Sequence, residues 1–163
     1  MDESVDLRQK QYVLFRLCDE EYGLPIASVR SIIRYEEPTP VPYAPEGVEG
    51  VFNLRGQVLP LIDLGRRLRG ESLAPTPASR IIVAESGLGA VGLAVDMVHE
   101  VASIPESDIR PAPQAALAGE TADAFLGVAS FGDRLVILLD PDKALPKAVF
   151  ASSGMLQEGD LDA

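Results

Sequence analysis

Few side chains in this sequence are of types that could catalyse a reaction. His99 is the only histidine and Cys18 the only cysteine, and they stand far apart in the chain. A lone histidine at a strand end is typical of a surface or partly packed residue, and a cysteine in a turn is typical of an incidental thiol. No nucleophile, base and orienting group occur together. The sequence therefore predicts a protein that is not an enzyme.

Three carboxylates raise the question of a metal site. Asp63, Asp96 and Asp140 each follow an apolar run, and carboxylates at strand ends could bind a divalent cation. Asp63 and Asp140, however, also stand where an aspartate caps the start of a short helix. The run 86–89 lacks the third glycine of a dinucleotide fingerprint and a following helix, so it predicts a turn. We expect no metal and no cofactor.

Among the polar residues, Arg55 stands out because it lies on a predicted turn. Two apolar β-type runs flank Asn53 to Gln57, and Gly56 can supply the positive φ of a tight reversal. A guanidinium on a rigid turn can form charge-assisted or bidentate bonds to a partner's carboxylates or helix-end carbonyls. The alternative is a solvated turn arginine. Arg55 therefore marks a candidate binding surface.

The segment that carries Arg55 belongs to an internal repeat. A frame that opens with Gly-Val and closes with Asp occurs at 50–63 and again, with the same spacing, at 127–140. Upstream of these two segments, 22–32 lines up with 91–101. Each copy reads as a pair of hairpins, followed by a short helix after Asp63 or Asp140.

Short strands separated by turn residues predict an all-β protein built from small β-barrels. We expect residues 12–78 to form the first barrel and 79–146 the second, one duplicated half to each barrel, together making one domain. Residues 1–11 and 151–163 are predicted to be flexible tails. Apolar residues paired by the repeat, Val29 with Val98 and Ile32 with Val101, could line a groove between the barrels that accepts a partner helix. The alternative is that they are core residues.

Composition limits the partners. The chain has 163 residues, of which 47% are hydrophobic and 24% charged, and its net charge is −11. Such a charge argues against nucleic acid or an anionic membrane as a partner. No apolar run approaches the length of about 20 residues that spans a bilayer, and the polar N-terminus is unlike a signal peptide. One cysteine suits a reducing compartment. We expect a cytoplasmic protein that binds other proteins.

The motif Asn53-Leu54-Arg55-Gly56, followed by the run 58–64, resembles the signature of the CheW-like family, the adaptors of bacterial chemosensory arrays. Further segments resemble the family in the same order, so that the resemblance extends from Tyr12 to Leu145. These segments are 15–24, 91–96, 109–113 and 132–138. The resemblance implies two five-stranded, SH3-like β-barrels, in agreement with the duplication.

The resemblance also implies a function. Family members couple chemoreceptors to a CheA-type histidine kinase: the tip of a receptor's helical hairpin docks between the barrels, and the kinase's regulatory CheW-like domain docks barrel to barrel. Carried over by position, the receptor-binding residues are Arg55, Asn53, Val29, Ser31, Ile32, Val98 and Val101. The kinase-binding residues are Ile26, Pro38, Val58, Gln114 and Ala115.

Two positions depart from the better-known chemotaxis adaptors. Ser31 stands where they carry a glutamate in the receptor-contact region, and Ala115 stands where they carry a phenylalanine after the Pro-Ala-Pro segment. The second kinase contact, which closes adaptor and kinase into rings, is therefore in question. We expect coupling in an accessory pathway, such as one for surface motility. The alternatives are a stand-alone modulator that binds receptor or kinase without activating the kinase, and a small-ligand-binding β-barrel protein.

Overall fold

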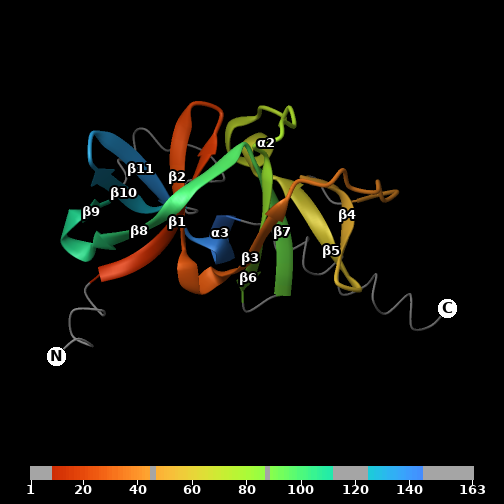
Figure 1. Cartoon of the computed structure of the whole chain (residues 1–163), viewed down its shortest axis with the longest axis horizontal. Coiled ribbons are helices and arrows are strands. Elements are labelled where there is room, and N and C mark those ends of the chain that lie inside the picture. The colour runs from red at the N-terminus through yellow and green to blue at the C-terminus, as the bar shows by residue number, and fades with distance from the viewer. Residues whose placement is uncertain (1–8, 45–46, 87–88, 112–124, 145–163) are drawn as a thin grey trace.

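The computed structural model of the chain describes residues 9–44, 47–86, 89–111 and 125–144. Two β-sheets make up most of this part of the chain, which confirms the predicted all-β class (Figure 1). The six-stranded sheet has the order β8-β1-β2-β11-β10-β9, and the five-stranded sheet has the order β3-β6-β7-β5-β4.

The strands of the six-stranded sheet are β1 (Gln9–Leu17), β2 (Glu20–Pro25), β8 (Met97–Pro105), β9 (Ile109–Arg110), β10 (Phe125–Phe131) and β11 (Arg134–Leu139). Those of the five-stranded sheet are β3 (Val29–Arg34), β4 (Val48–Leu54), β5 (Gln57–Asp63), β6 (Arg80–Ser86) and β7 (Gly89–Val95). Short helices are η1 (Ile26–Ser28), α2 (Leu64–Arg69), η2 (Glu106–Asp108) and α3 (Pro141–Ala144).

Both predicted helices form, and each begins at its capping aspartate. The Asp63 carboxylate accepts a hydrogen bond from the Arg66 N–H at 3.2 Å, and Gly70, with φ 77°, ends α2. The Asp140 carboxylate accepts a hydrogen bond from the Asp142 N–H at 3.0 Å at the start of α3. These carboxylates satisfy backbone donors that a helix end would otherwise leave unpaired.

The strands of the two halves are exchanged between the sheets. The hairpin β1–β2 comes from the first half but lies between β8 and β11 of the second, and β6–β7 lies between β3 and β5 of the first. The prediction that residues 12–78 close one barrel and 79–146 the other is therefore wrong. The repeat identifies two similar copies, but it does not indicate which copy each hairpin pairs with.

Two further details differ from the expected strands. β1 begins at Gln9, within the predicted tail, because Gln9 to Gln11 pair with Ser103 to Pro105 of β8. The second barrel has a sixth strand, β9, whose Arg110 pairs with Val128. At the equivalent place in the five-stranded barrel the prolines around Thr39 leave a single bridge, from Thr39 to Val51.

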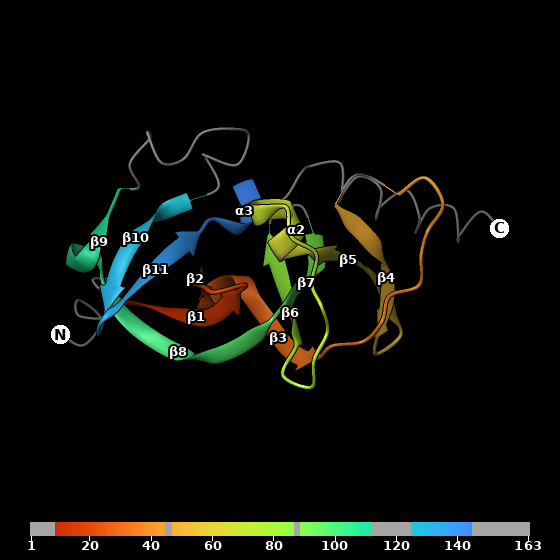
Figure 2. The same ribbon diagram turned by 90° about the horizontal axis from the view of Figure 1, so that it is seen from above.

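Figure 2 shows the two sheets side by side, and three apolar clusters form the core of the described residues. One fills the six-stranded barrel, one fills the five-stranded barrel, and the largest, here called the seam core, lies between them. Along β1 the side chains alternate, since Tyr12 and Leu14 point into the barrel while Val13 and Phe15 join the seam core. Both faces of β1 are thus buried, which explains its continuous apolar run from Tyr12 to Phe15.

Candidate functional site

The turn between β4 and β5 presents Arg55 to solvent in a fixed conformation. Arg55 has φ 52° and Gly56 has φ 87°, and two positive φ values are the mark of a type I′ hairpin turn. The Asn53 side chain accepts a hydrogen bond from the Gly56 N–H at 2.8 Å and so braces the turn. The Arg55 side chain is exposed and has no hydrogen bond or ion pair among the described residues. Its guanidinium is therefore free to bind a partner.

A second arginine, Arg30, lies beside this turn and was missed by the sequence prediction. Its guanidinium donates a hydrogen bond to the Gln57 side chain at 3.3 Å and lies 3.6 Å from the Glu85 carboxylate. Gln57 follows Gly56 directly, so this contact brings the start of β3 next to the turn. The repeat makes Arg30 and His99 equivalent residues, but no sequence pattern indicates that Arg30 lies beside the Arg55 turn.

Four of the predicted receptor-binding residues lie on sheet faces that meet at the seam. Val29 and Ile32 of β3 pair with Ala84 and Ile82, and both partners belong to the seam core. On β8, Val98 and Val101 pair with Phe15 and Val13, which also belong to it. Val29 and Val98 pack against the core, whereas Ile32 and Val101 are 39% and 49% exposed. Val29 and Val98 therefore belong with the core, and Ile32 and Val101 lie at the surface.

Ser31 lies on a different face from this set. It pairs with Val83, whose side chain belongs to the core inside the five-stranded barrel. Residues paired across two antiparallel strands share a face, so Ser31 points toward the interior while Ile32 points toward the seam. The structure does not bring Ser31 together with Ile32.

Three of the predicted kinase-binding residues lie on separate segments of the structure. Val58 is exposed and pairs with Asn53, so it lies next to the Arg55 turn. Ile26 is exposed in η1, just before β3. Pro38 is half-buried where its segment crosses β4 closely at Gly50. Gln114 and Ala115 lie outside the described residues, and their role stays a prediction.

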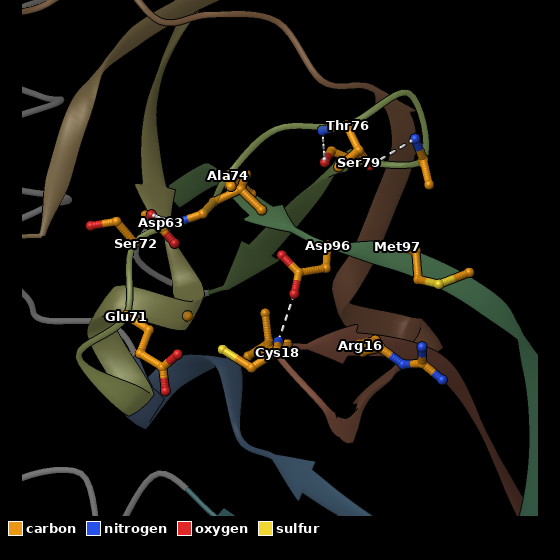
Figure 3. Close-up of a pocket in the computed structure, with 15 residues that line it drawn as sticks. Arg16, Cys18, Asp63, Glu71, Ser72, Ala74, Thr76, Ser79, Asp96 and Met97 are labelled. Carbon is orange, nitrogen blue, oxygen red and sulfur yellow. Dashed lines mark hydrogen bonds between the residues drawn. The ribbon is translucent and has the colours of Figure 1, made fainter.

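A pocket of about 400 Å³ opens at the seam beside α2 (Figure 3). The Asp96 carboxylate reaches the turn after β1 and accepts a hydrogen bond from the Cys18 N–H at 2.6 Å. The Asp63 carboxylate accepts one from the Leu73 N–H, also at 2.6 Å. Burial raises the pKa of the Cys18 thiol, so this cysteine stays protonated at neutral pH. Asp96 therefore ties the β1–β2 turn to the junction of β7 and β8, and Asp63 ties the end of β5 to the loop before β6.

Known proteins of one family are similar to this chain over most of its length. The family model for the CheW-like domain matches residues 11–149. This chain belongs to the CheW-like family. Among its relatives, the chemotaxis protein CheW of Rhizobium meliloti is 37% identical over 84% of this chain and 88% of that protein. Protein FrzA of Myxococcus xanthus is 34% identical over 86% of this chain and 88% of that protein.

A solved relative supports the same fold. The crystal structure of the scaffolding protein TtCheW from Thermoanaerobacter tengcongensis is similar with a TM-score of 0.71 and 36% sequence identity. The match covers 80% of this chain and 84% of that one. The CheW-like assignment thus rests on both sequence and structure, and it confirms the predicted two-barrel fold.

The end of the six-stranded barrel of this CheW-like chain carries a charge cluster. Glu21 is buried, and both of its carboxylate oxygens accept hydrogen bonds from Arg134, at 3.0 and 3.1 Å. The Nε2 atom of His99 lies 3.2 Å from the same carboxylate, and Arg134 also bonds Glu100 at 3.1 Å. The Glu100 and Glu21 carboxylates raise the pKa of Arg134. The Glu21 carboxylate therefore lies beside Arg134 of β11 and His99 of β8, so that the cluster joins β2, β8 and β11.

The six-stranded barrel also exposes apolar side chains that the sequence prediction missed. Leu135 is 67% exposed and Leu126 is 46% exposed, on neighbouring strands β11 and β10. Leu135 follows Gly127 at the same spacing at which Val58 follows Gly50, so the repeat places it at the equivalent position of the second barrel. The repeat, applied to Val58, was the signal that could have identified it.

Within residues 9–44, 47–86, 89–111 and 125–144, no three His, Cys, Asp or Glu side chains gather into a metal-binding group. No helix in the same ranges is long and apolar enough to cross a membrane.

Proposed function

We propose that this protein is a non-enzymatic adaptor that couples chemoreceptors to a CheA-type histidine kinase. The receptor's helical tip contacts Arg55, Asn53 and the seam-facing residues Val29, Ile32, Val98 and Val101. The kinase's regulatory CheW-like domain docks on the neighbouring surface that carries Ile26 and Val58. The adaptor works in the cytoplasm, where receptors recruit it to their arrays.

The observation that carries this proposal is the Arg55 turn. A non-glycine residue held at positive φ costs about 1–2 kcal/mol, so a rigid turn with an arginine at its tip is an expensive arrangement for a solvated side chain. The turn lies beside Arg30 and the start of β3, so a single partner could contact the cation and the seam-facing apolar residues together. Family membership over residues 11–149 supports the same function.

The orientation of Ser31 bears on the kind of chemosensory pathway that the adaptor serves. Ser31 points away from the seam-facing residues, so this chain binds its receptor without a contact from that position. We place the adaptor in an accessory chemosensory pathway, such as one for surface motility. Deletion of the gene should then impair surface spreading and leave swimming unchanged, and the opposite pattern would assign it to the swimming pathway.

The test is kinase autophosphorylation with the cognate kinase, a receptor signalling fragment and this protein. We expect a large rise that requires all three components. Arg55→Ala should weaken receptor binding by about 1.5–3 kcal/mol, the typical contribution of a hydrogen bond to a charged group. Arg110→Ala is the matched control, because Arg110 is also exposed and has no polar partner among the described residues.

The assay also separates the alternatives. Receptor or kinase binding without a rise in phosphorylation would identify a modulator. A loss of less than about 0.5 kcal/mol for Arg55→Ala would exclude the turn as a receptor contact. Binding to neither protein, with stabilisation by a metabolite instead, would identify a small-ligand-binding protein.

A further inference from the structure

Two arginines face each other across neighbouring strands at one end of the five-stranded sheet. Arg34, the last residue of β3, pairs directly with Arg80, the first residue of β6. Side chains paired in this way share a face, with their Cβ atoms about 4.5–5.5 Å apart, and like charges at such positions destabilise the sheet. The pairing thus places two positive side chains next to each other, an arrangement that an anion between them would stabilise.

The protein does not supply that anion among its described residues. The chain carries 25 acidic and 14 basic side chains, yet neither Arg34 nor Arg80 forms an ion pair within the described ranges. Arg80 Nη1 instead donates to two backbone carbonyls, of Pro77 at 2.9 Å and Ser79 at 2.8 Å. These bonds fix its guanidinium in place and leave its charge without a counter-ion.

A pocket of about 290 Å³ lies at this pair, and its other polar side chains are hydroxyls. Its lining consists of Arg34, Tyr35, Thr76, Pro77, Ser79 and Arg80. The loop before β6, part of which Figure 3 shows, orients two of the hydroxyls. Ser79 Oγ accepts a hydrogen bond from the Thr76 N–H at 2.9 Å, and Thr76 Oγ1 accepts one from the Ala78 N–H at 3.1 Å. Both hydroxyl protons thus remain available to donate.

Tyr35 also lines the pocket, and its side chain packs against the core inside the five-stranded barrel. Burial raises the pKa of Tyr35, and the nearby charges of Glu37, Asp63 and Glu49 raise it further, so the phenol keeps its proton at neutral pH. The lining includes two guanidinium groups and the hydroxyls of Thr76 and Ser79, and no carboxylate side chain. Such a set suits an acceptor with several oxygens and a negative charge.

We propose that this pocket is a binding site for an oxyanion, a phosphate or carboxylate group held between Arg34 and Arg80. The group comes either from a free small anion or from an acidic side chain of a bound protein. Arg34 and Ile32 are two residues apart on one strand, so they share the seam-facing side of β3. The second source rests on the proposed receptor binding.

The first experiment is a titration of the full-length protein with sodium phosphate at constant ionic strength, followed by amide NMR. We expect shifts confined to the end of β3, the start of β6 and the loop 74–79. Arg34→Gln should weaken phosphate binding at least about tenfold. It leaves the carbonyl contacts of Arg80 in place, so the fold should be retained, which the same spectra check. Arg110→Gln, on the far barrel, should bind phosphate like the wild type.

The second experiment measures binding of a receptor signalling fragment to Arg34→Glu and to its control Arg110→Glu. If phosphate has no effect but Arg34→Glu alone weakens receptor binding about tenfold or more, the anion is a carboxylate of the partner. Phosphate shifts that persist in Arg34→Gln, or no phosphate effect together with unchanged receptor binding, overturn the site. If the wild type fails to bind the receptor fragment, the proposed function fails and the phosphate titration alone decides on the site.

Discussion

At the scale of single residues, several polar side chains of this protein fix the backbone. Asn53 braces the Arg55 turn, Asp96 holds the turn at Cys18, and Asp63 holds both the start of α2 and Leu73. Each accepts hydrogen bonds from backbone N–H groups in a turn or loop, where no strand partner is available. Arg55, Arg34 and Arg110 differ, since no polar contact within the described ranges occupies their side chains.

Tyr22 provides a prediction at this scale. Its ring is buried and stacked on Phe15 with 6.0 Å between the ring centroids, and its hydroxyl donates to the Glu20 carboxylate at 3.0 Å. Burial raises the pKa of Tyr22 from 10.0 to about 12. The folded state therefore favours the neutral phenol. The resulting stabilisation is complete below pH 10 and is lost as the pH rises toward 12.

Urea unfolding at a series of pH values from 8 to 11.5 tests this. The wild type should lose about 2 kcal/mol more of its free energy of unfolding over this range than Tyr22→Phe, which has no phenol to ionise. Tyr43→Phe, which removes a fully exposed phenol, should follow the wild type. Equal pH dependence of the wild type and Tyr22→Phe would contradict the assigned cause.

At the scale of elements, the repeat fills both barrels by the same device. Gly23 and Gly92 are equivalent residues, and each leaves room for an apolar side chain in a barrel interior. A Cβ at Gly92 would lie 2.4 Å from the Phe52 ring, and one at Gly23 would lie 2.8 Å from Leu138. The parallel pairs β5–β7 and β2–β11 run through these positions.

Gly92→Ala should therefore destabilise the protein by about 1–3 kcal/mol, because the buried Phe52 ring must move. Adding Phe52→Leu should recover part of that loss, so that the double variant is more stable than the sum of the single effects predicts. Chemical denaturation of the three variants measures this cycle. Strict additivity would show that the Phe52 contact does not restrict the site. A Gly92→Ala effect below about 0.5 kcal/mol, the usual size for substitutions that disturb no packing, would show the same.

Local features of these elements were predictable from the sequence, and long-range pairings were not. The caps at Asp63 and Asp140, the Arg55 turn and the duplication depend on residues near one another in the chain. Arg30 was missed because its partner Gln57 is brought close only by the sheet. The faces of Ile32 and Ser31 depended on a register shift between Val29 and Ser31, which no sequence pattern indicated.

At the scale of the whole molecule, neither half of the chain holds a complete sheet. Separate fragments 1–78 and 79–163 should therefore lack native β structure when alone and regain it when mixed, because each sheet needs hairpins from both. Circular dichroism of each fragment and of the mixture, with the intact chain as the reference, measures this. A fragment that unfolds cooperatively by itself would show that half a chain can close its own barrel.

The exchange of hairpins also sets the order in which the barrels can form during synthesis. The five-stranded sheet is complete once β7 has emerged at Val95, whereas β1 and β2 must wait for β8 and for β11, which ends at Leu139. Between Pro25 and Leu139 the ribosome adds 114 residues, so at about 5–20 residues per second the first hairpin is without its partner β11 for roughly 6–23 s. The first strands made are thus the last to be enclosed, and during that interval their apolar faces are exposed to chaperones or to other nascent chains.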